Sequence, residues 1–203
     1  MKKRVAILIS GRGSNMEALI RAAEAPDYPA EIVGGLSNRA DAGGLAFAAA
    51  AGIPAAVCSH KDFADRETFD AALEAVLVGW QAEIVCLAGF MRVLTHHFVE
   101  KFPLRIVNTH PSLLPAFPGV DAPAQALAYG VKVSGVTVHF VDTSLDGGPI
   151  IAQVPVAVLP GDDAAALHAR IQREEHRLLP EVVQRLAAGR LSCKGRHVVS
   201  RAE

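Results

Sequence analysis

Short runs of apolar and β-branched residues recur through the first half of the chain, and Ala- and Leu-rich stretches with helical spacing lie between the first four of them. The runs predict strands at 4–10, 30–37, 55–59, 83–89 and 105–110. Strands that alternate with helices are typical of a parallel sheet that is covered on both faces. The pattern therefore predicts an α/β fold built on a doubly wound, mostly parallel, Rossmann-like sheet with helices on both faces.

The pattern changes after Pro118. A short helix is predicted at about 122–129, and two long apolar runs at 132–142 and 149–159 predict a pair of antiparallel strands. The second half of the chain therefore adds an antiparallel strand pair to the mostly parallel sheet.

A single long helix is predicted to close the fold. Asp162 or Asp163 can cap its N-terminus, and Gly189 is suited to its end. The residues from 191 onward are polar, and no internal repeat or flexible linker divides the chain. We therefore expect one domain over 1–190, followed by a loosely held tail over 191–203.

Composition excludes several classes of function. The 203 residues are 51% hydrophobic and carry a net charge of −1, with one short basic run at 2–4, so the electrostatic footprint of a nucleic-acid-binding protein is missing. The three cysteines have no CxxC spacing, which favours neither a disulfide framework nor a thiolate zinc site and fits a reducing cytoplasm. The apolar run 5–9 is too short for a signal peptide, and no later segment is long enough to cross a bilayer. We expect a cytoplasmic protein that binds neither nucleic acid nor membranes.

The segment ISGRGSNMEALI follows the first predicted strand and opens a helix. Gly11 and Gly13 allow a tight turn and a close approach of the backbone to a ligand, and the free N–H groups from Ser14 onward favour an anion. Met16 stands where a dinucleotide fingerprint has its third glycine, and the P-loop lysine is missing, so one phosphomonoester fits better than NAD or ATP. A plain glycine turn with Ser14 as its N-cap remains the alternative.

Polar side chains also follow later strands. Asn108 and His110 end the last strand of the first half, and Arg92 follows the strand before it. Asp146 precedes a Gly-Gly-Pro turn, and if that turn reaches back, its carboxylate can meet His110 in a site that stabilises an oxyanion and moves a proton. As alternatives, Asn108 and His110 only satisfy loop backbone, and Arg92 is a surface charge. No Ser or Cys is placed as a nucleophile, which indicates direct transfer between two bound substrates.

Four motifs carry a family resemblance: ISGRGSNMEAL, LAGFMRVL, NTHPSLLPAFPG and HFVDTSLDGGPIIAQ. In this order, and over nearly the whole chain, they resemble the folate-dependent formyl transferases, and within them the phosphoribosylglycinamide formyltransferases. The resemblance implies transfer of a formyl group from 10-formyltetrahydrofolate to the glycine amine of 5'-phosphoribosylglycinamide in purine (IMP) biosynthesis. It implies direct attack of the amine through a tetrahedral intermediate, with no metal.

The same resemblance implies roles for individual residues, each carried over on the matching motif. The implied catalytic residues are Asn108, His110 and Asp146. The implied phosphate and ribose contacts are Gly13, Ser14, Asn15, Arg66, Gln172 and Glu175. The implied folate contacts are Met91, Arg92, Val93, Leu94, Val141, Asp142, Thr143, Ser144 and Leu145. A cis peptide bond between Leu114 and Pro115 is also implied.

Three positions depart from the family pattern, namely Arg12, Asp121 and Pro123. Other functions remain open: a hydrolase that deformylates 10-formyltetrahydrofolate, a formyltransferase for initiator tRNA, and a non-catalytic phosphoribosyl- or nucleotide-binding module. The first two usually carry a further domain, for which we expect no room in this chain. The expected partners are the two small-molecule substrates, and we expect a monomer or a homodimer.

Overall fold

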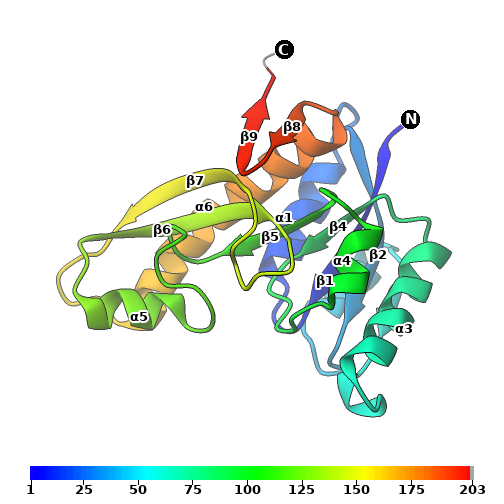
Figure 1. Cartoon of the computed structure of the whole chain (residues 1–203), viewed down its shortest axis with the longest axis horizontal. Coiled ribbons are helices and arrows are strands. Elements are labelled where there is room, and N and C mark those ends of the chain that lie inside the picture. Colours follow the sequence, from blue (N-terminus) through cyan, green and yellow to red (C-terminus); the bar gives the residue numbers. More distant parts are fainter. Residues whose placement is uncertain (202–203) are drawn as a thin grey trace.

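A seven-stranded sheet forms the centre of the molecule, which the computed structural model describes over residues 1–201 (Figure 1). Its strand order is β3-β2-β1-β4-β5-β6-β7. The strands are β1 (Lys3–Ile9), β2 (Ala30–Ser37), β3 (Ala55–Val57), β4 (Ile84–Leu87), β5 (Ile106–His110), β6 (Val133–Phe140) and β7 (Ile150–Ala157). The first five strands are parallel, whereas β6 is antiparallel to β5 and β7 is antiparallel to β6. The predicted fold class is confirmed.

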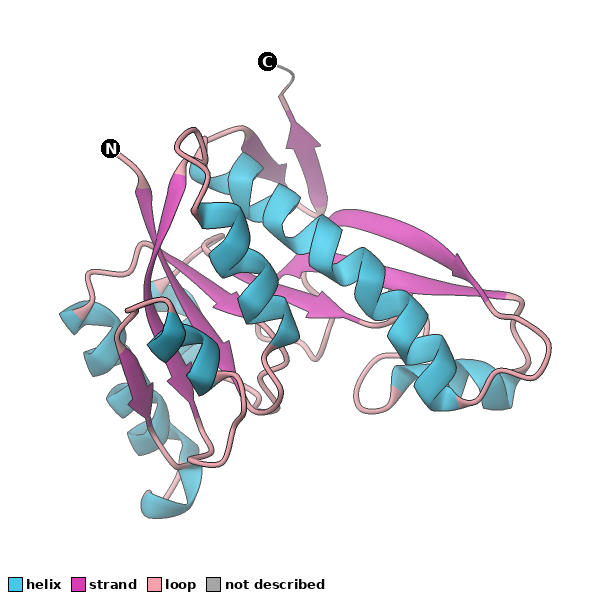
Figure 2. Cartoon of the chain, turned by 180° about the vertical axis from the view of Figure 1, so that it is seen from behind, coloured by secondary structure: helices cyan, strands magenta, loops and turns pink. Residues whose placement is uncertain are grey.

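Helices cover both faces of this sheet, as Figures 1 and 2 show from opposite sides. The helices are α1 (Ser14–Ala23), α2 (Leu45–Ala50), the short 3₁₀ helix η1 (His60–Asp62), α3 (Arg66–Gly79), α4 (His96–Lys101), α5 (Ala122–Tyr129) and α6 (Ala164–Ala187). One apolar core holds the buried side chains of α1 and α6, and a second core holds those of α3 and α4. Ile7 belongs to the first core and Leu8 to the second, because successive side chains of a strand point to opposite faces. This double burial explains the unbroken apolar run of β1.

Side-chain caps fix the starts of the long helices. Oδ1 of Asp65 accepts a hydrogen bond from the backbone N–H of Thr68 at the start of α3. In the same way, Oδ1 of Asp163 accepts from the backbone N–H of Ala166 at 2.7 Å, which satisfies a donor that the first turn of α6 leaves unpaired. Gly189 lies two residues beyond α6 with a φ of +69°. The predicted start and end of the closing helix are confirmed.

The topology brings the polar strand ends to one edge. β1 pairs with β2 on one side and with β4 on the other, so the strand order reverses between β1 and β4. In doubly wound sheets a ligand crevice opens at the carboxyl ends of the strands next to such a reversal. The glycine turn after β1, the loop after β4 and the end of β5 therefore meet at this edge.

A short helix, α4, lies between β4 and β5 where no helix was predicted. Its N-cap is Thr95, whose hydroxyl accepts from the backbone N–H of Phe98. Phe98 and Val99 are buried in the core beneath α3 and α4. Six residues with only two buried side chains do not establish a helical period, which explains why the sequence pattern missed this element.

The segment beyond α6 forms a β-hairpin of β8 (Leu191–Lys194) and β9 (His197–Ser200). Leu191 and Val198 are partly buried against the core. The last two residues of the predicted tail, 202–203, lie outside the described residues. The loose attachment of this segment stays a prediction.

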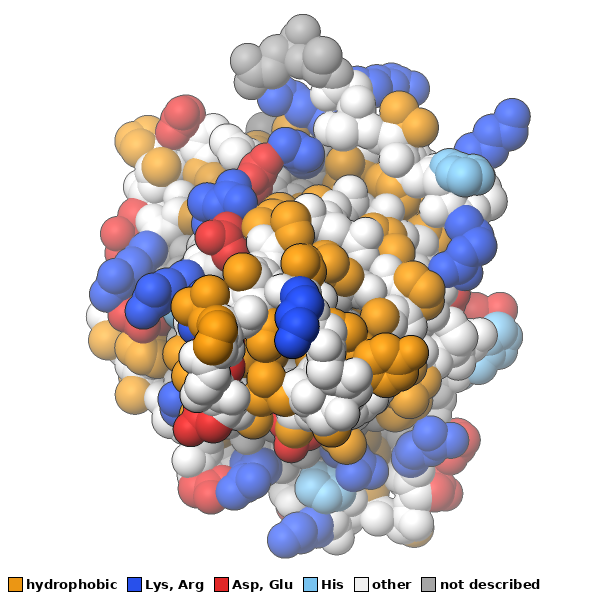
Figure 3. All heavy atoms as spheres, turned by 90° about the vertical axis from the view of Figure 1, so that its left-hand side faces the viewer, with side chains coloured by type: hydrophobic (Ala, Val, Ile, Leu, Met, Phe, Trp, Pro, Cys, Tyr) orange, Lys and Arg blue, Asp and Glu red, His pale blue; other side chains and the backbone are white. Residues whose placement is uncertain are grey.

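Apolar side chains are exposed at the end of the molecule where α5 and the β6–β7 strand pair lie. Figure 3 looks onto this end and shows many hydrophobic side chains on its surface. Tyr129, Val133 and Leu159, near the ends of α5, β6 and β7, are each about half exposed or more. Among residues 1–201, no helix is both long enough and apolar enough to cross a membrane.

Candidate active site

A cavity of about 440 Å³ opens at the carboxyl ends of β1, β4 and β5. Residues 11–15, here called the anion loop, line one part of it together with His168, Gln172 and Glu175 of α6. The β4 loop (87–94) and the β6 loop (141–146) line another part. Residues 108–111 at the end of β5 also line the cavity. The predicted catalytic residues and most of the predicted phosphate, ribose and folate contacts therefore lie around one cavity.

His110 is held at both of its ring nitrogens. Nε2 lies 2.8 Å from the backbone carbonyl oxygen of Phe117, and Nδ1 lies 3.4 Å from Oδ2 of Asp146. A carbonyl and a carboxylate only accept hydrogen bonds, so a ring with a proton on each nitrogen satisfies both neighbours at once. His110 is 4% exposed, and the Asp146 side chain beside it is largely buried.

Asp146 is positioned by the backbone of two loops. Its φ of +50° is in the left-handed region, which aspartate adopts more readily than most residues. Its Oδ2 also accepts a hydrogen bond from the backbone N–H of Gly119 at 2.7 Å. The turn that follows needs glycine, because a side chain at Gly148 would begin 1.8 Å from the carbonyl oxygen of Phe140. The predicted return of the Gly-Gly-Pro turn toward His110 is confirmed.

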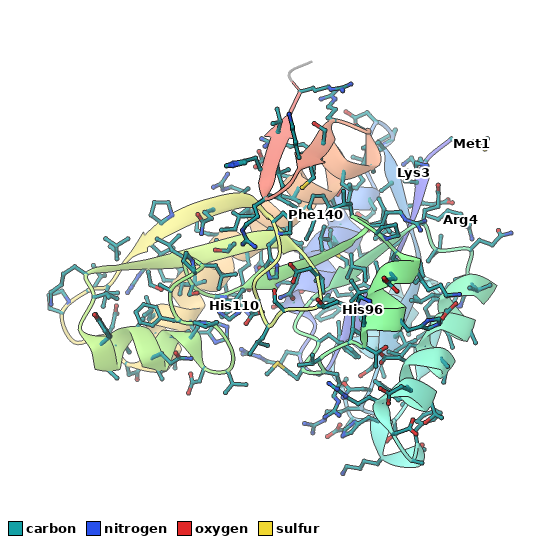
Figure 4. The ribbon with its side chains drawn as sticks, in the orientation of Figure 1. Met1, Lys3, Arg4, His96, His110 and Phe140 are labelled. Carbon is teal, nitrogen blue, oxygen red and sulfur yellow. The ribbon has the colours of Figure 1, made fainter. Side chains whose placement is uncertain are left out.

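Asn108 faces a buried histidine on the neighbouring strand. Asn108 on β5 pairs directly with His139 on β6, and the side-chain nitrogen Nδ2 lies 3.2 Å from Nε2 of His139. Phe140, the residue after His139, is labelled with His110 in Figure 4, and the two come from adjacent strands. Burial lowers the pKa of His139, against the opposing effects of a hydrogen bond to the Phe140 carbonyl and of the nearby Asp146 carboxylate.

The anion loop leaves the start of α1 open. Gly13 is the N-cap with a φ of +76°, and no side chain caps the helix. A side chain at Gly13 would begin 2.4 Å from Cα of Gly44, so glycine is needed for packing as well as for backbone conformation. The hydroxyl of Ser14, which could have been an N-cap, instead accepts a hydrogen bond from Nε2 of Gln172 at 2.9 Å. The alternative expectation, a glycine turn in which the side chain of Ser14 caps α1, is therefore wrong.

The buried amide of Asn15, the last residue of the anion loop, lies against the buried carboxylate of Glu175. Nδ2 of Asn15 donates to Oε2 of Glu175 at 2.9 Å, and the two residues are 7% and 4% exposed. Oδ1 of Asn15 has no hydrogen-bond partner among the described residues. A buried acceptor without a donor is costly, so this oxygen is suited to a hydroxyl or amine of a bound molecule.

The β4 loop is tied to β1. The backbone N–H of Met91 donates to the hydroxyl of Ser10 at 2.8 Å, and that hydroxyl donates to Oδ1 of Asn38 at 2.6 Å. Met91 and Val93 are 64% and 54% exposed, whereas Leu94 is buried. Exposed apolar side chains at the rim of a cavity favour an apolar ligand face.

Comparison with known proteins places the chain in a family. The model of the formyl transferase family matches residues 3–183. The chain belongs to this family. A phosphoribosylglycinamide formyltransferase of Mycobacterium tuberculosis is 45% identical over 194 residues, which are 95% of this chain and 89% of that protein. The crystal structure of glycinamide ribonucleotide transformylase 1 from Symbiobacterium toebii has a TM-score of 0.96 at 45% identity, over 98% of this chain and 94% of that chain.

A longer relative contains the same region. The trifunctional purine biosynthetic protein adenosine-3 of Drosophila pseudoobscura is 50% identical over 192 residues, which are 94% of this chain. The chain spans only 14% of the length of that protein. The likeness therefore covers one part of a larger polypeptide in that relative.

This formyl transferase brings most of the predicted site residues to one cavity. The predicted residues that line it are Asn108, His110, Asp146, Gly13, Ser14, Asn15, Gln172, Glu175, Met91, Arg92, Val93, Leu94, Val141, Asp142, Ser144 and Leu145. The peptide bond between Leu114 and Pro115 is cis, as the resemblance implies. Arg12, Asp121 and Pro123, where the chain departs from the family pattern, also line the cavity.

Two predicted residues of the formyl transferase do not line the cavity. Arg66 is the first residue of α3, and it is exposed at the surface. Thr143 is exposed in the β6 loop, where the carboxylate of Asp142 accepts from both the backbone N–H and the hydroxyl of Ser144 and closes a turn around it. Geometry gives these two assignments no support.

Sequence reasoning missed two histidines of the formyl transferase. His139 and His168 line the cavity. His168 lies one helical turn before Gln172, so helical spacing could have indicated that both side chains are on the same face of α6. His139 stands in an apolar strand and could be linked to Asn108 only through the strand register. Within residues 1–201, no group of three His, Cys, Asp or Glu residues is arranged to hold a metal ion.

Proposed function

We propose that this formyl transferase moves a formyl group from 10-formyltetrahydrofolate to the glycine amine of 5'-phosphoribosylglycinamide, a step of purine biosynthesis. The observation that carries the proposal is the convergence of Asn108, His110 and Asp146 in one cavity with the anion loop and the β4 loop. The family match supports a folate-derived formyl donor. The names of two relatives, one from Mycobacterium tuberculosis and one from Symbiobacterium toebii, support the acceptor.

The phosphate of the acceptor binds at the anion loop. The uncapped backbone N–H groups and the positive end of the dipole of α1 favour an anion there. Ser14 and Gln172, which are joined by a hydrogen bond, add polar contacts. Asn15 and Glu175 bind the ribose hydroxyls, since a buried carboxylate and an unpaired amide oxygen are both acceptors for hydroxyl donors.

The folate donor binds against the β4 and β6 loops. Met91, Val93 and Leu145 present apolar surface at the rim of the cavity, where a flat ring system loses contact with water on binding. Arg92 lines the same region and is suited to a carboxylate of the donor. The two substrates then meet at Asn108, His110 and Asp146.

The chemistry is an attack of the glycine amine on the formyl carbon. The new C–N bond forms as the formyl oxygen takes up negative charge, and the bond between the formyl carbon and the folate nitrogen then breaks. The amine loses one proton and the folate nitrogen gains one, so the exchange is balanced without a covalent enzyme intermediate. Binding both substrates in one cavity supplies much of the rate, because it removes the entropy cost of their encounter.

Asn108 and His110 stabilise the charge that develops on the formyl oxygen. The amide of Asn108 donates a hydrogen bond, and protonated His110 donates a charge-assisted one. His110 can do so only by giving up one of its two present neighbours, the Phe117 carbonyl or Asp146. The carboxylate of Asp146 stabilises the positive charge on His110. It also takes part in moving the proton from the glycine amine to the folate nitrogen.

The experiment that tests this function follows release of tetrahydrofolate from 10-formyltetrahydrofolate by the purified protein, with and without phosphoribosylglycinamide. We expect release that depends on the acceptor, together with one formylated ribosylglycinamide for each folate released. Release at the same rate without the acceptor would identify a hydrolase instead. No release in either case, with binding of the phosphoribosyl compound alone, would identify a non-catalytic binding module.

A further inference from the structure

His139 is a deeply buried titratable side chain next to the catalytic residues, and the proposed chemistry gives it no role. The residue is 2% exposed, on the face of β6 opposite to the apolar side chains of Val138 and Phe140. Both of its ring nitrogens have polar neighbours at hydrogen-bond distance. Burial of a titratable ring at this position is expensive unless its hydrogen bonds are made in one defined way.

The neighbours of His139 define its tautomer. Nδ1 lies 2.9 Å from the carbonyl oxygen of Phe140, which can only accept, so Nδ1 carries the proton. Nε2 lies 3.2 Å from Nδ2 of Asn108, and an amide nitrogen can only donate, so Nε2 accepts. The neutral ring with its proton on Nδ1 is the form that satisfies both contacts.

The contact with the Phe140 carbonyl alone places the proton of the neutral ring on Nδ1, and this independently defines the orientation of the Asn108 amide. If that amide were rotated by half a turn, its oxygen would face the lone pair on Nε2 and the hydrogen bond would be lost. One N–H of the amide is used by His139, and the second N–H is left to donate into the cavity that Asn108 lines. A rotated amide would instead present oxygen toward the negative charge that develops on the formyl group.

We propose that His139 is a positioning residue, which acts as a neutral acceptor at Nε2 and fixes the Asn108 amide so that its free N–H faces the formyl oxygen. The inference rests on the proposed function, since it assigns the free N–H to a formyl transfer. Its structural half, the tautomer of His139 and the orientation of the amide, holds independently of which substrate the cavity binds.

Protonation of His139 would reverse this arrangement. A proton on Nε2 would remove the acceptor for Asn108 and turn Nε2 toward Oδ1 of Asp146, 4.0 Å away. The charged or titratable groups that face His139 are Asp146 and Asp142 from the segment after β6, and His110 from β5. The residue paired with it on β7 is the uncharged Ile150. Burial keeps the pKa of His139 low, which preserves the neutral acceptor at neutral pH.

Kinetics of three variants test the positioning role. His139→Leu removes the acceptor, His139→Gln replaces it with an amide that can accept from Asn108, and Val138→Ala weakens the same strand from its other face. For His139→Leu we expect kcat to fall about tenfold to a hundredfold with both KM values within about twofold, because the lost hydrogen bond matters in the transition state. His139→Gln should recover most of kcat, and Val138→Ala should lower Tm but leave kcat within about twofold.

The pH profile separates positioning from packing. We expect wild-type kcat to fall on the acid side as His139 gains a proton, and His139→Gln to lose that part of the fall because it cannot titrate. The proposal is wrong if His139→Leu keeps wild-type kcat, or if kcat follows Tm in the same way for His139→Leu and Val138→Ala. It is also wrong if the acid limb is the same in His139→Gln.

A spectroscopic measurement on the wild-type protein does not depend on activity or on any variant. The ¹⁵N spectrum of labelled histidine at neutral pH should show the His139 ring with a proton on Nδ1 and none on Nε2, with the Nε2 signal coupled to an Asn108 amide hydrogen. A proton on Nε2 would overturn the inference. If the wild-type protein does not transfer a formyl group while the tautomer is as described, the proposed function fails and the orientation of the amide stands.

Discussion

Oδ2 of Asp146 lies 3.4 Å from Nδ1 of His110 and also accepts a hydrogen bond from the backbone N–H of Gly119. One carboxylate oxygen therefore contacts both His110 and the loop before α5. In the proposed reaction Asp146 acts through His110, so the two side chains would form one functional unit. Their substitution effects should not be independent.

Double substitution tests this coupling. We expect His110→Ala and Asp146→Asn each to lower kcat by roughly 10²–10³, on the scale of a lost oxyanion contact. An asparagine keeps an oxygen that can accept from Gly119, so the loop should stay in place and only the charge is lost. The double variant should lose much less than the product of the two effects. If steady-state kinetics show that the double variant loses as much kcat as the two single effects multiplied together, the two residues act separately.

The anion loop is best tested away from Gly13. A valine there would collide with Gly44 and disturb folding as well as binding, so its effect on KM would be ambiguous. Ser14→Ala and Gln172→Ala should each raise KM for phosphoribosylglycinamide by about three- to tenfold, the scale of one hydrogen bond, and leave KM for the folate unchanged.

An isosteric charge provides the matched comparison for this loop. Gln172→Glu keeps the size of the side chain but adds a negative charge beside the phosphate, so KM for the acceptor should rise further than in Gln172→Ala. A rise in KM for the folate alone would contradict the assignment of phosphate to this end of the cavity. Equal values for the Ala and Glu variants would also count against an anion there.

Asp70 gives a prediction for stability. This residue of α3 is 3% exposed, its Oδ2 accepts from the backbone N–H of Thr95 at 2.6 Å, and its Oδ1 has no partner within the described part of the chain. Burial raises the pKa of Asp70, against the lowering effect of its hydrogen bonds with Thr95. The folded state therefore holds the proton more tightly than the unfolded state does. The resulting stability is fully present below the unfolded pKa of about 3.9 and is lost as pH rises through the folded pKa.

Asp70→Asn should remove this pH dependence, because an asparagine can still accept from Thr95 but does not bury a charge. We expect the free energy of unfolding of the variant, relative to wild type, to increase between pH 4 and pH 7 in urea titrations. A difference that stays constant or shrinks over this range would mean that Asp70 is not held at a raised pKa. Thr95→Ala serves as a control, since it alters the same contact region without removing the carboxylate.

The C-terminal hairpin tests the predicted loose attachment of residues 191–203. Its strands expose most of their side chains, and a guanidinium nitrogen of Arg196 donates to the backbone carbonyl of Gly147 at 2.8 Å. We expect the amide hydrogens of β8 and β9 to exchange with solvent many times faster than those of β1 and β4, because few buried contacts oppose local opening. Protection equal to that of the central strands would show instead that the hairpin belongs to the cooperative core.

The sequence predicted those parts of the fold and site that local patterns determine. Unbroken apolar strands and helical spacing indicated the parallel sheet, and the motifs around Asn108, His110 and Asp146 indicated the site. The contact between Asn108 and His139 depends on the register of β5 against β6, which no local pattern encodes. The hairpin after α6 was missed because its strands are short and mostly exposed, so they have no clear apolar alternation.

For the predicted binding residues too, some positions follow from local sequence patterns and others depend on tertiary packing. The cavity residues of the anion and β4 loops follow directly from the strand ends that carry them. Arg66 could be assigned only by resemblance, and its place at the exposed start of α3 depends on how that helix packs. Thr143 was assigned as part of a continuous loop, whereas the turn closed by Asp142 and Ser144 separates it from the cavity lining.

The central claim is that Asn108, His110 and Asp146 act in the transition state, and its most direct test compares turnover with stability in Asn108→Ala. We expect kcat to fall by about 10²–10³, the scale of a lost oxyanion donor, with both KM values changed far less. Tm should fall by no more than the loss of the one hydrogen bond to His139 accounts for, because Asn108 lines the cavity and is only half-buried. Near-normal kcat combined with a much lower Tm would contradict the account, since the three side chains would then be a structural hydrogen-bond cluster.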